Sequence, residues 1–244
     1  MTGRSLQWLY EAPQTPLSSG LERAQMQAAM LAAIAASSAR RLVAVDVGCG
    51  DGMATAVAAA RCAQTPGAAV SIIGLDWSCA ALDRARRRGV SVARASINSP
   101  GLPLASGSVD VVIMSELIEH LVDTDAALAE ARRALVPGGR LLLSTPNLAA
   151  WYNRVLLVLG IQPLFTEVSL HGIYGRPGRA VVGHLRLFTR RALQELLGAA
   201  GFVEIKITGA PYHDVPRPFR PLDRLACHAP GLSSILLACA RRPA

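Results

Sequence analysis

The sequence has 244 residues, of which 51% are hydrophobic and 17% charged, and its 25 basic and 17 acidic residues give a net charge of +8. This length and hydrophobicity suit one α/β domain with insertions. No apolar stretch is long and uninterrupted enough to predict a transmembrane segment, and no signal-peptide pattern is visible, so we expect a cytoplasmic protein. The five cysteines are odd in number and lack CxxC spacing, which predicts neither a disulfide framework nor a zinc site.

The positive charge is spread along the chain. Arg residues are scattered, and no basic run with interleaved aromatic residues occurs. This distribution is typical of solvated helix faces, and it does not favour nucleic acid as a partner.

The first 40 residues are expected to form an N-terminal arm and an Ala-rich capping helix over 21–38. Strands and helices then alternate. Leu42 to Val47 is a continuous apolar run, typical of a strand that is buried on both faces of a parallel sheet. The pattern predicts further strands at 70–76, 90–95, 109–114 and 140–144, and helices at 53–62, 80–88 and 124–135. Such alternation indicates βαβ units.

The alternation breaks after the fifth strand, at residues 146–188. It resumes with a helix over 189–200, which Thr189 can cap and Gly201 can end, and a strand over 202–208. Residues 210–232 are Pro-rich and predicted to be irregular, and 233–240 is the last strand. Loops of this length inside one domain are usually functional. We therefore expect residues 41–244 to form a single domain, with 146–188 and 210–232 as a substrate lid.

Ligands of open parallel sheets bind beyond the carboxyl ends of the strands. The first strand ends in Gly48-Cys49-Gly50-Asp51-Gly52, where glycines allow a sharp turn and the close approach of a ligand. The spacing is GxGxG and not the GxGxxG of dinucleotide-binding folds, which disfavours a nicotinamide dehydrogenase. By itself the loop could be only a tight turn.

The second strand ends in Asp76-Trp77. A carboxylate at this place can accept hydrogen bonds from both hydroxyls of a ribose, and the indole ring can lie against adenine. The alternatives are a helix-capping Asp and a core Trp. Together with the glycine loop, the pair favours a nucleoside cofactor.

At this point the chain resembles the class I S-adenosylmethionine-dependent methyltransferases, in particular the small-molecule group with ubiquinone- and menaquinone-pathway relatives. The resemblance runs from about residue 40 to 146, and its motifs are Asp46–Gly52, Asp76, Asn98–Leu104, Gly107–Val112, Ser115–His120 and Leu135–Leu141, with His184–Thr189 and Gly201-Phe202 later in the chain. It implies an α/β fold with a Rossmann-like, doubly wound, seven-stranded sheet. This sheet is mostly parallel with an antiparallel last strand, and helices cover both faces.

The resemblance also implies the cofactor, S-adenosyl-L-methionine, and the residues that bind it. The glycine loop would pass under the methionine moiety, Asp76 would hold the ribose, and Trp77 would flank the adenine. The expected cofactor-binding residues are Asp46, Gly48, Cys49, Gly50, Gly52, Asp76, Trp77, Ile97, Asn98, Ser115 and Glu116. Asn98 stands where the family usually has Asp.

Methyl transfer is an in-line displacement, so the enzyme must align the two reactants and exclude water. A hydroxyl or carbon acceptor must also lose a proton, and His120 is the candidate catalytic base, although it could simply anchor a helix start. The candidate substrate-binding residues are Tyr152, His171, Tyr174 and His184. For each of these, packing within a loop is the alternative. We expect no metal site.

The sequence therefore predicts a methyltransferase that acts on a small molecule, leaving the accepting atom and the oligomeric state open. An excess of Arg in the first insertion suggests an anionic acceptor, and apolar residues there suggest a hydrophobic one. The alternatives are a methyltransferase acting on RNA or protein, and a non-catalytic methyltransferase-like binding module. Trp151 to Leu159 could be a lid helix or a peripheral membrane contact. The sequence Ser115-Glu116-Leu117-Ile118, which follows the fourth strand, argues against methylation of nucleobase amino groups.

Overall fold

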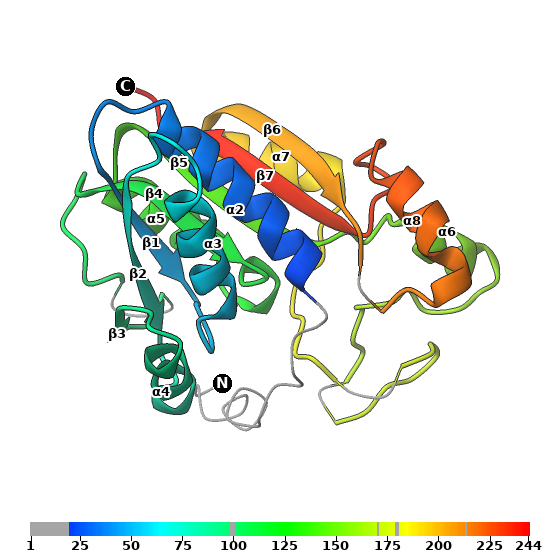
Figure 1. The fold of residues 1–244 in the computed structure, drawn as a ribbon. Helices are drawn as coiled ribbons and strands as arrows, with labels where there is room; N and C mark the ends of the chain where they lie inside the picture. Colours follow the sequence, from blue (N-terminus) through cyan, green and yellow to red (C-terminus); the bar gives the residue numbers. More distant parts are fainter. Residues whose placement is uncertain (1–19, 98–100, 170, 179–180, 213) are drawn as a thin grey trace.

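The computed structural model describes residues 20–97, 101–169, 171–178, 181–212 and 214–244 (Figure 1). Most of the N-terminal arm lies outside the described residues, and so does Asn98 of the candidate cofactor site. Seven strands form one sheet in the order β3-β2-β1-β4-β5-β7-β6. The strands are β1 (Leu42–Val47), β2 (Val70–Asp76), β3 (Val92–Arg94), β4 (Val109–Ser115), β5 (Leu135–Pro146), β6 (Val203–Ala210) and β7 (Ile235–Arg241).

The pairing of the strands confirms the expected fold class. Strands β1 to β5 pair in parallel, whereas β7 lies between β5 and β6 and is antiparallel to both. The order of strands reverses at β1 and β4, which are neighbours although two strands separate them in the chain. In doubly wound sheets this reversal opens a crevice beyond the carboxyl ends of those two strands.

Helices cover both faces of the sheet. In Figure 1, α2 and α3 lie in front of it and α5 and α7 lie behind it. The helices are α2 (Leu21–Ala36), α3 (Met53–Ala63), α4 (Cys79–Arg87), α5 (Thr124–Ala134), α6 (Trp151–Val158), α7 (Arg190–Ala199) and α8 (Arg220–Ala226), with short 3₁₀ turns at η1 (Ile118–His120) and η2 (Arg217–Phe219). The predicted cap of α7 is confirmed, because the Thr189 side chain accepts a hydrogen bond from the Ala192 amide.

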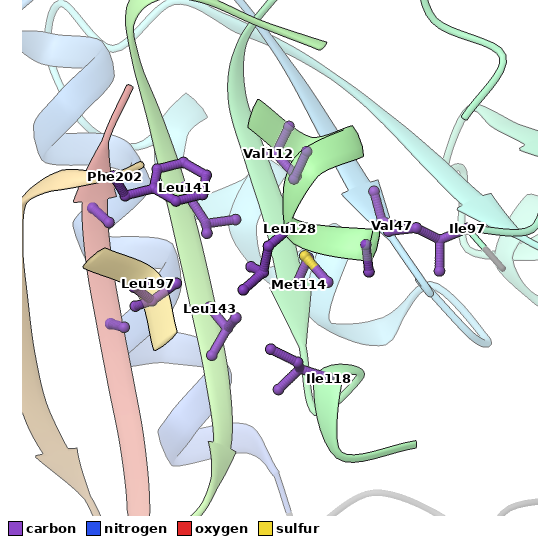
Figure 2. Close-up of a cluster of buried hydrophobic side chains, with 14 of the residues drawn as sticks. Val47, Ile97, Val112, Met114, Ile118, Leu128, Leu141, Leu143, Leu197 and Phe202 are labelled. Atoms are coloured by element: carbon purple, nitrogen blue, oxygen red, sulfur yellow. The ribbon is translucent and has the colours of Figure 1, made fainter. Parts of the chain in front are cut away.

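The two layers of the core follow the alternation of side chains along the strands. Val45 and Val47 of β1 point toward α5 and α7, in the cluster that Figure 2 shows. Leu42 and Ala44 of the same strand point the other way, into the cluster formed with α2 and α3. Each central strand is thus buried on both faces, which explains the unbroken apolar runs in the sequence.

Two segments differ from the sequence prediction. The fifth strand begins earlier than expected, at Leu135, and Pro137–Gly139 lie within it at an irregularity where the register with β4 shifts. The region 210–232 is not wholly irregular, because α8 lies within it. Its Pro221 occupies the first turn of that helix, where a missing amide hydrogen breaks no helical hydrogen bond.

The second insertion and the first meet at α6 and α8, which lie side by side at one end of the molecule (Figure 1). Within the described ranges, no helix combines the length and the apolar character needed to cross a membrane.

Candidate functional site

The glycine loop forms a compact turn at the carboxyl end of β1. The amides of Gly48 and Cys49 both donate to the Leu75 carbonyl of β2, at 2.8 and 3.0 Å, which joins the loop to the neighbouring strand. All three glycines adopt positive φ, between 55° at Gly50 and 76° at Gly52. This conformation is costly for residues with a Cβ, so the loop requires glycine for its backbone alone.

The three glycines differ in what surrounds them. A Cβ on Gly48 would lie 2.8 Å from Leu117 Cδ1, and one on Gly52 would lie 2.7 Å from the Ala85 Cβ. Among the residues that the structure describes, none has an atom within 4 Å of a Cβ on Gly50. Gly48 and Gly52 therefore serve internal packing, whereas Gly50 presents bare backbone to open space that a ligand can enter.

Asp76 ends β2 beside the loop. Its Oδ2 accepts a hydrogen bond from the Gly50 amide at 2.9 Å, and its Oδ1 accepts one from the Ser78 amide at 2.8 Å. The carboxylate thus fixes the loop and the start of α4. Each oxygen retains a second lone pair, so these bonds leave it able to accept from ribose hydroxyls as well.

Asp46 and Ser115 face α2, at the ends of the two strands between which the strand order reverses. Asp46 is 2% exposed, and its Oδ2 accepts a hydrogen bond from the Thr55 hydroxyl at 2.5 Å. Burial raises the pKa of Asp46 to about 6. Among the described residues, Asp46 Oδ1 has no hydrogen-bond partner. Ser115 donates to Gln27 Oε1 at 2.6 Å, so its hydroxyl is tied to α2.

The remaining cofactor candidates differ in exposure. Cys49 is buried against Gly74, and burial strongly raises the pKa of its thiol, so only its backbone is available to a ligand. Ile97 is buried, whereas Trp77 is half-buried at the start of the segment that leads into α4.

Glu116 follows β4 with a φ of 50°, a strained conformation for a residue with a side chain. Its amide donates to both the carbonyl and the hydroxyl of Ser144 on β5, at 3.0 and 3.1 Å. Its carboxylate lies 3.8 Å from Arg23 of α2, whose side chain is 12% exposed. This part of the site therefore joins α2, β4 and β5.

A cluster of three titratable side chains lies just beyond Glu116. Glu119, His120 and His184 each place a candidate ligand atom within 4.8 Å of the other two. The two imidazole rings are 4.8 Å apart between centroids. Burial lowers the pKa of both imidazoles, that of His184 to about 3, so both are neutral near pH 7. The structure thus brings the candidate base and one of the candidate substrate residues together.

The first insertion is folded around the buried carboxylate of Glu167. Its oxygens accept hydrogen bonds from the amides of Val182, Gly183 and His184, at 2.6, 2.8 and 3.2 Å. Arg176 lies 3.7 Å away as a buried ion-pair partner. These contacts fix the 182–184 backbone, which places the His184 ring beside the His120 ring.

A second buried carboxylate, Asp223 of α8, joins the two insertions. It accepts hydrogen bonds from the Trp151 indole at 3.0 Å, from the Tyr212 amide at 2.9 Å and from the Ser234 hydroxyl. Tyr152 lies beside this junction with its ring edge-on to Trp151, and burial raises the pKa of its phenol.

Other candidate substrate residues lie elsewhere. His171 is exposed and Tyr174 is 61% exposed, so the structure does not bring them into the cluster. Arg154 and Arg186 are exposed and donate to backbone carbonyls. Together with the pairing of Arg176 to Glu167, this engages the described Arg residues of the insertion in structural contacts.

Sequence reasoning overlooked Glu119, Glu167 and Asp223 as individual residues. Glu119 stands inside the Ser115–His120 motif, so its place directly before His120 was a usable signal. Glu167 and Asp223 carry no motif, and their importance comes from partners distant in the chain that only the fold reveals.

Comparisons with known proteins agree with this geometry. A family model described as "Methyltransferase domain" matches residues 45–143. The ubiquinone biosynthesis O-methyltransferase of Methylococcus capsulatus is 35% identical over 68% of this chain and 68% of its own length. The trans-aconitate 2-methyltransferase of Methylobacterium radiotolerans is 30% identical over 79% of this chain and 68% of its own length.

Several other relatives are matched over less than two thirds of their own length, and the solved structures show only the fold. A probable S-adenosylmethionine-dependent methyltransferase of Mycolicibacterium smegmatis is 38% identical, but the match spans only 37% of that relative's length. The crystal structure of an S-adenosylmethionine-dependent methyltransferase from Thermotoga maritima aligns with a TM-score of 0.59 over 91% of both chains, at 19% identity.

The fold, the loop and the relatives define a class: the chain belongs to the class I S-adenosylmethionine-dependent methyltransferases. S-adenosylmethionine is the cofactor that this family implies. The residues present fit it, because Gly50 exposes bare backbone beside the carboxylate of Asp76, and Asp46 offers a buried oxygen with no partner among the described residues.

Proposed function

We propose that this protein transfers a methyl group from S-adenosylmethionine to an oxygen atom of a small, largely apolar molecule. The observation that carries the proposal is the position of residues 115–120 between two features. Leu117 packs against Gly48 of the cofactor loop, and the Glu119 carbonyl accepts hydrogen bonds from Leu185 and Arg186 of the insertion. This segment therefore links the cofactor loop to the acceptor side.

The bound cofactor supplies a methyl group on a positively charged sulfur, which leaves as a neutral thioether. The chain holds the cofactor through the backbone of the glycine loop and through Asp76, which fixes one reactant. The insertion excludes water from the acceptor side, and His120 lies there as a neutral imidazole that can accept the acceptor's proton. Alignment and desolvation are the two contributions that such a reaction needs from the protein.

Three observations support a small apolar acceptor over RNA or protein. The insertion packs directly on the 115–120 segment, which narrows access to it. Phe165 and Tyr212 stack edge-on beside His184, which gives the acceptor side aromatic walls. The names of the two relatives that are at least 30% identical over two thirds of their length refer to the biosynthesis of ubiquinone and to trans-aconitate, and both compounds are small molecules.

Binding of S-adenosylhomocysteine tests the cofactor half of the proposal. We expect it to raise the melting temperature of the protein, because it binds the folded state, and we expect Asp76→Ala to weaken binding about a hundredfold through the loss of two charge-assisted hydrogen bonds. Asp83→Ala, which removes an exposed carboxylate on α4, is the matched control and should bind normally. Absence of binding to the folded wild-type protein would refute the proposal.

Turnover tests the acceptor half. Methylation of a panel of phenolic, carboxylic and longer-chain apolar acceptors, against bulk RNA and protein, should give product only with small molecules. Product with RNA or protein alone would favour the macromolecular alternative, and binding of cofactor without any turnover would favour the non-catalytic module.

We further propose that the acceptor is reached at an anionic membrane surface. Eight large apolar side chains of α6, α8 and their flanks are exposed, and Val158 alone is 87% exposed. They are Val155, Leu157, Val158, Leu159, Phe219, Leu222, Leu225 and Leu232. The exposed Arg154, Arg217 and Arg224 lie on the same elements. Apolar side chains flanked by Arg are the pattern of helices that rest on anionic lipid.

Sedimentation with phosphatidylglycerol vesicles tests this surface. We expect the wild-type protein to bind, and Val158→Glu to reduce partitioning about tenfold, because a charge replaces a buried apolar group in the lipid. Val122→Glu is the control, since Val122 is similarly exposed but lies outside α6 and α8. Equal binding of all three proteins, or concentration-dependent dimerisation through the same residues, would contradict the membrane role.

A further inference from the structure

We infer that Glu119, His120 and His184 form a binding site for one divalent first-row transition-metal ion, at which the oxygen of the methyl acceptor coordinates. Binding of the ion stands on the geometry of these residues alone. Only its role in holding the acceptor rests on the proposed function.

The three ligand atoms are close enough to share an ion. They lie within 4.8 Å of one another. An ion with bonds of about 2.0–2.2 Å holds its ligand atoms roughly 3–4 Å apart, so binding requires side-chain shifts of about 1 Å. The set is one carboxylate and two imidazoles, which leaves coordination positions for a substrate.

Both imidazoles are oriented by backbone carbonyls, as metal-binding histidines usually are. His120 Nδ1 lies 3.1 Å from the Gly183 carbonyl, and His184 Nδ1 lies 3.1 Å from the Phe165 carbonyl. A carbonyl can only accept, so in each ring the hydrogen is on Nδ1 and the lone pair is on Nε2. This tautomer places the ligand nitrogen on the side away from the carbonyl.

Glu119 is a buried carboxyl group whose partners leave a charge to be compensated. It is 0% exposed, and its Oε2 accepts a hydrogen bond from the Thr145 hydroxyl at 3.0 Å. Its Oε1 has no hydrogen-bond partner within the described ranges. A buried carboxylate with one unpaired oxygen is costly unless a cation lies beside it, and a metal ion is such a partner.

The fold holds the three ligands in place from outside the cluster. Glu167 binds the 182–184 amides and so positions both His184 and the Gly183 carbonyl that orients His120. The Glu119 carbonyl binds the amides of Leu185 and Arg186, at 2.7 and 3.0 Å. Ligands from two distant parts of the chain are therefore fixed to each other before any ion binds, which lowers the entropic cost of binding.

The donor set selects the class of ion. Two imidazole nitrogens favour Mn²⁺, Co²⁺ or Zn²⁺ over Mg²⁺ and Ca²⁺, which prefer oxygen ligands. With the ion bound, the lone pair of His120 is used for coordination, so His120 no longer takes the acceptor's proton. The ion instead lowers the pKa of the coordinated hydroxyl, which loses its proton to water. Both electrons of the O–H bond then stay on the oxygen that attacks the methyl carbon.

Titration of the full chain with Co²⁺, Mn²⁺, Zn²⁺ and Mg²⁺, followed by calorimetry and by Co²⁺ absorption in the visible range, tests the site. We expect one Co²⁺ per chain with bands typical of nitrogen and oxygen ligands, and binding of Mg²⁺ at least about tenfold weaker. His184→Ala and Glu119→Gln should each weaken Co²⁺ binding at least about tenfold. His228→Ala, which removes an exposed imidazole of the same chain, should bind Co²⁺ as the wild type does.

Each outcome decides the inference. Absence of Co²⁺, Mn²⁺ and Zn²⁺ binding in the wild type, or affinities unchanged in both cluster variants, would overturn it. Circular dichroism and thermal unfolding, measured on each variant, report whether the variant is folded. Co²⁺ binding in a protein that does not bind S-adenosylhomocysteine would leave the metal site standing and refute the proposed function. If turnover does not depend on a metal ion but is lost in His120→Ala, His120 acts as the base and the proposed role of the ion in holding the acceptor is wrong.

Discussion

Different interactions stabilise the two insertions and the edge of the sheet that carries the glycine loop and Asp76, which we call the cofactor edge. At the edge, the glycine loop is held by backbone hydrogen bonds to the adjacent strand, as in the bonds from Gly48 and Cys49 to Leu75. The insertions contain little regular structure, and buried polar side chains hold them instead. Glu167, Asp223 and Asn153 each bind backbone or side-chain groups at least ten residues away in the chain.

This difference separates the parts whose conformation depends on the fold from the parts whose conformation depends on individual side chains. Backbone bonds between strands tolerate many side chains, so a loop of this kind can serve a whole family. A loop that depends on one carboxylate is specific to its sequence, so we expect a change there to alter the side where we propose that the acceptor binds, and to leave the proposed cofactor side intact. The contrast predicts that the two regions respond differently to mutation.

The largest effect is expected at Glu167. Glu167→Ala removes the acceptor of three backbone amides and leaves Arg176 buried without its carboxylate. Breaking a buried ion pair from one side costs about 3–5 kcal/mol, so we expect the free energy of unfolding to fall by about 4 kcal/mol in urea denaturation. Amide exchange should rise at residues 182–184.

Glu195→Ala is the control for that change. Glu195 forms an exposed pair with Arg191 on α7, and its removal should change stability by no more than about 0.5 kcal/mol. If the two variants lose the same stability, or if Glu167→Ala abolishes S-adenosylhomocysteine binding in a protein that remains folded, the two regions are not independent as we describe them.

A second prediction concerns Asp46, a buried charge in the region that otherwise relies on backbone bonds. Its native pKa of about 6 lies above its unfolded value of 3.8, so the native state binds more protons between these pH values. The free energy of unfolding therefore falls as pH rises from 4 to 6. Asp46→Asn should restore about 2 kcal/mol at pH 7.5 and nothing at pH 3.5, in thermal and urea unfolding without cofactor.

Asp110 of β4 supplies the opposite case. Burial raises its pKa, but hydrogen bonds from Arg40 and from the Val43 amide outweigh burial and lower it overall. Asp110→Asn should therefore lower stability at pH 7.5, with the difference disappearing as pH falls through the depressed pKa.

If Asp46→Asn both stabilises the apo protein and weakens S-adenosylhomocysteine binding, the buried charge serves the cofactor. Stabilisation with unchanged affinity would remove Asp46 from the cofactor site.

The same contrast explains what could be predicted from the sequence. Apolar runs and glycine turns are local patterns, so the bounds of β1 and β4, the Thr189 cap and the Gly48–Gly52 turn follow from them. The antiparallel β7 was expected from the family resemblance, and its pairing between β5 and β6 confirms it. Local patterns suffice for the central strands because each of them is buried on both faces.

The acceptor side could not be predicted to the same depth. His120 was singled out and His184 was named, but nothing in the 63 positions between them indicates that their rings lie 4.8 Å apart. That proximity depends on Glu167, whose partners are 15 to 17 residues away in the chain. The α8 helix was not predicted, because the prolines of residues 210–232 indicate irregular structure. Pro221, however, lies in the first turn of α8, where proline is tolerated.

The smallest effect, and the sharpest test of the cofactor edge, compares Gly50 with Gly89. Both have positive φ, 55° and 78°, and within the described part of the chain no atom lies within 4 Å of a Cβ on either. Replacement by Ala should therefore cost each the same strain, about 1 kcal/mol in urea denaturation. Only Gly50→Ala should weaken S-adenosylhomocysteine binding, by about tenfold in calorimetry, because only there does the methyl group occupy the ligand's space. Equal affinities for the two variants would mean that the open side of Gly50 faces solvent, and that the cofactor contacts the loop elsewhere.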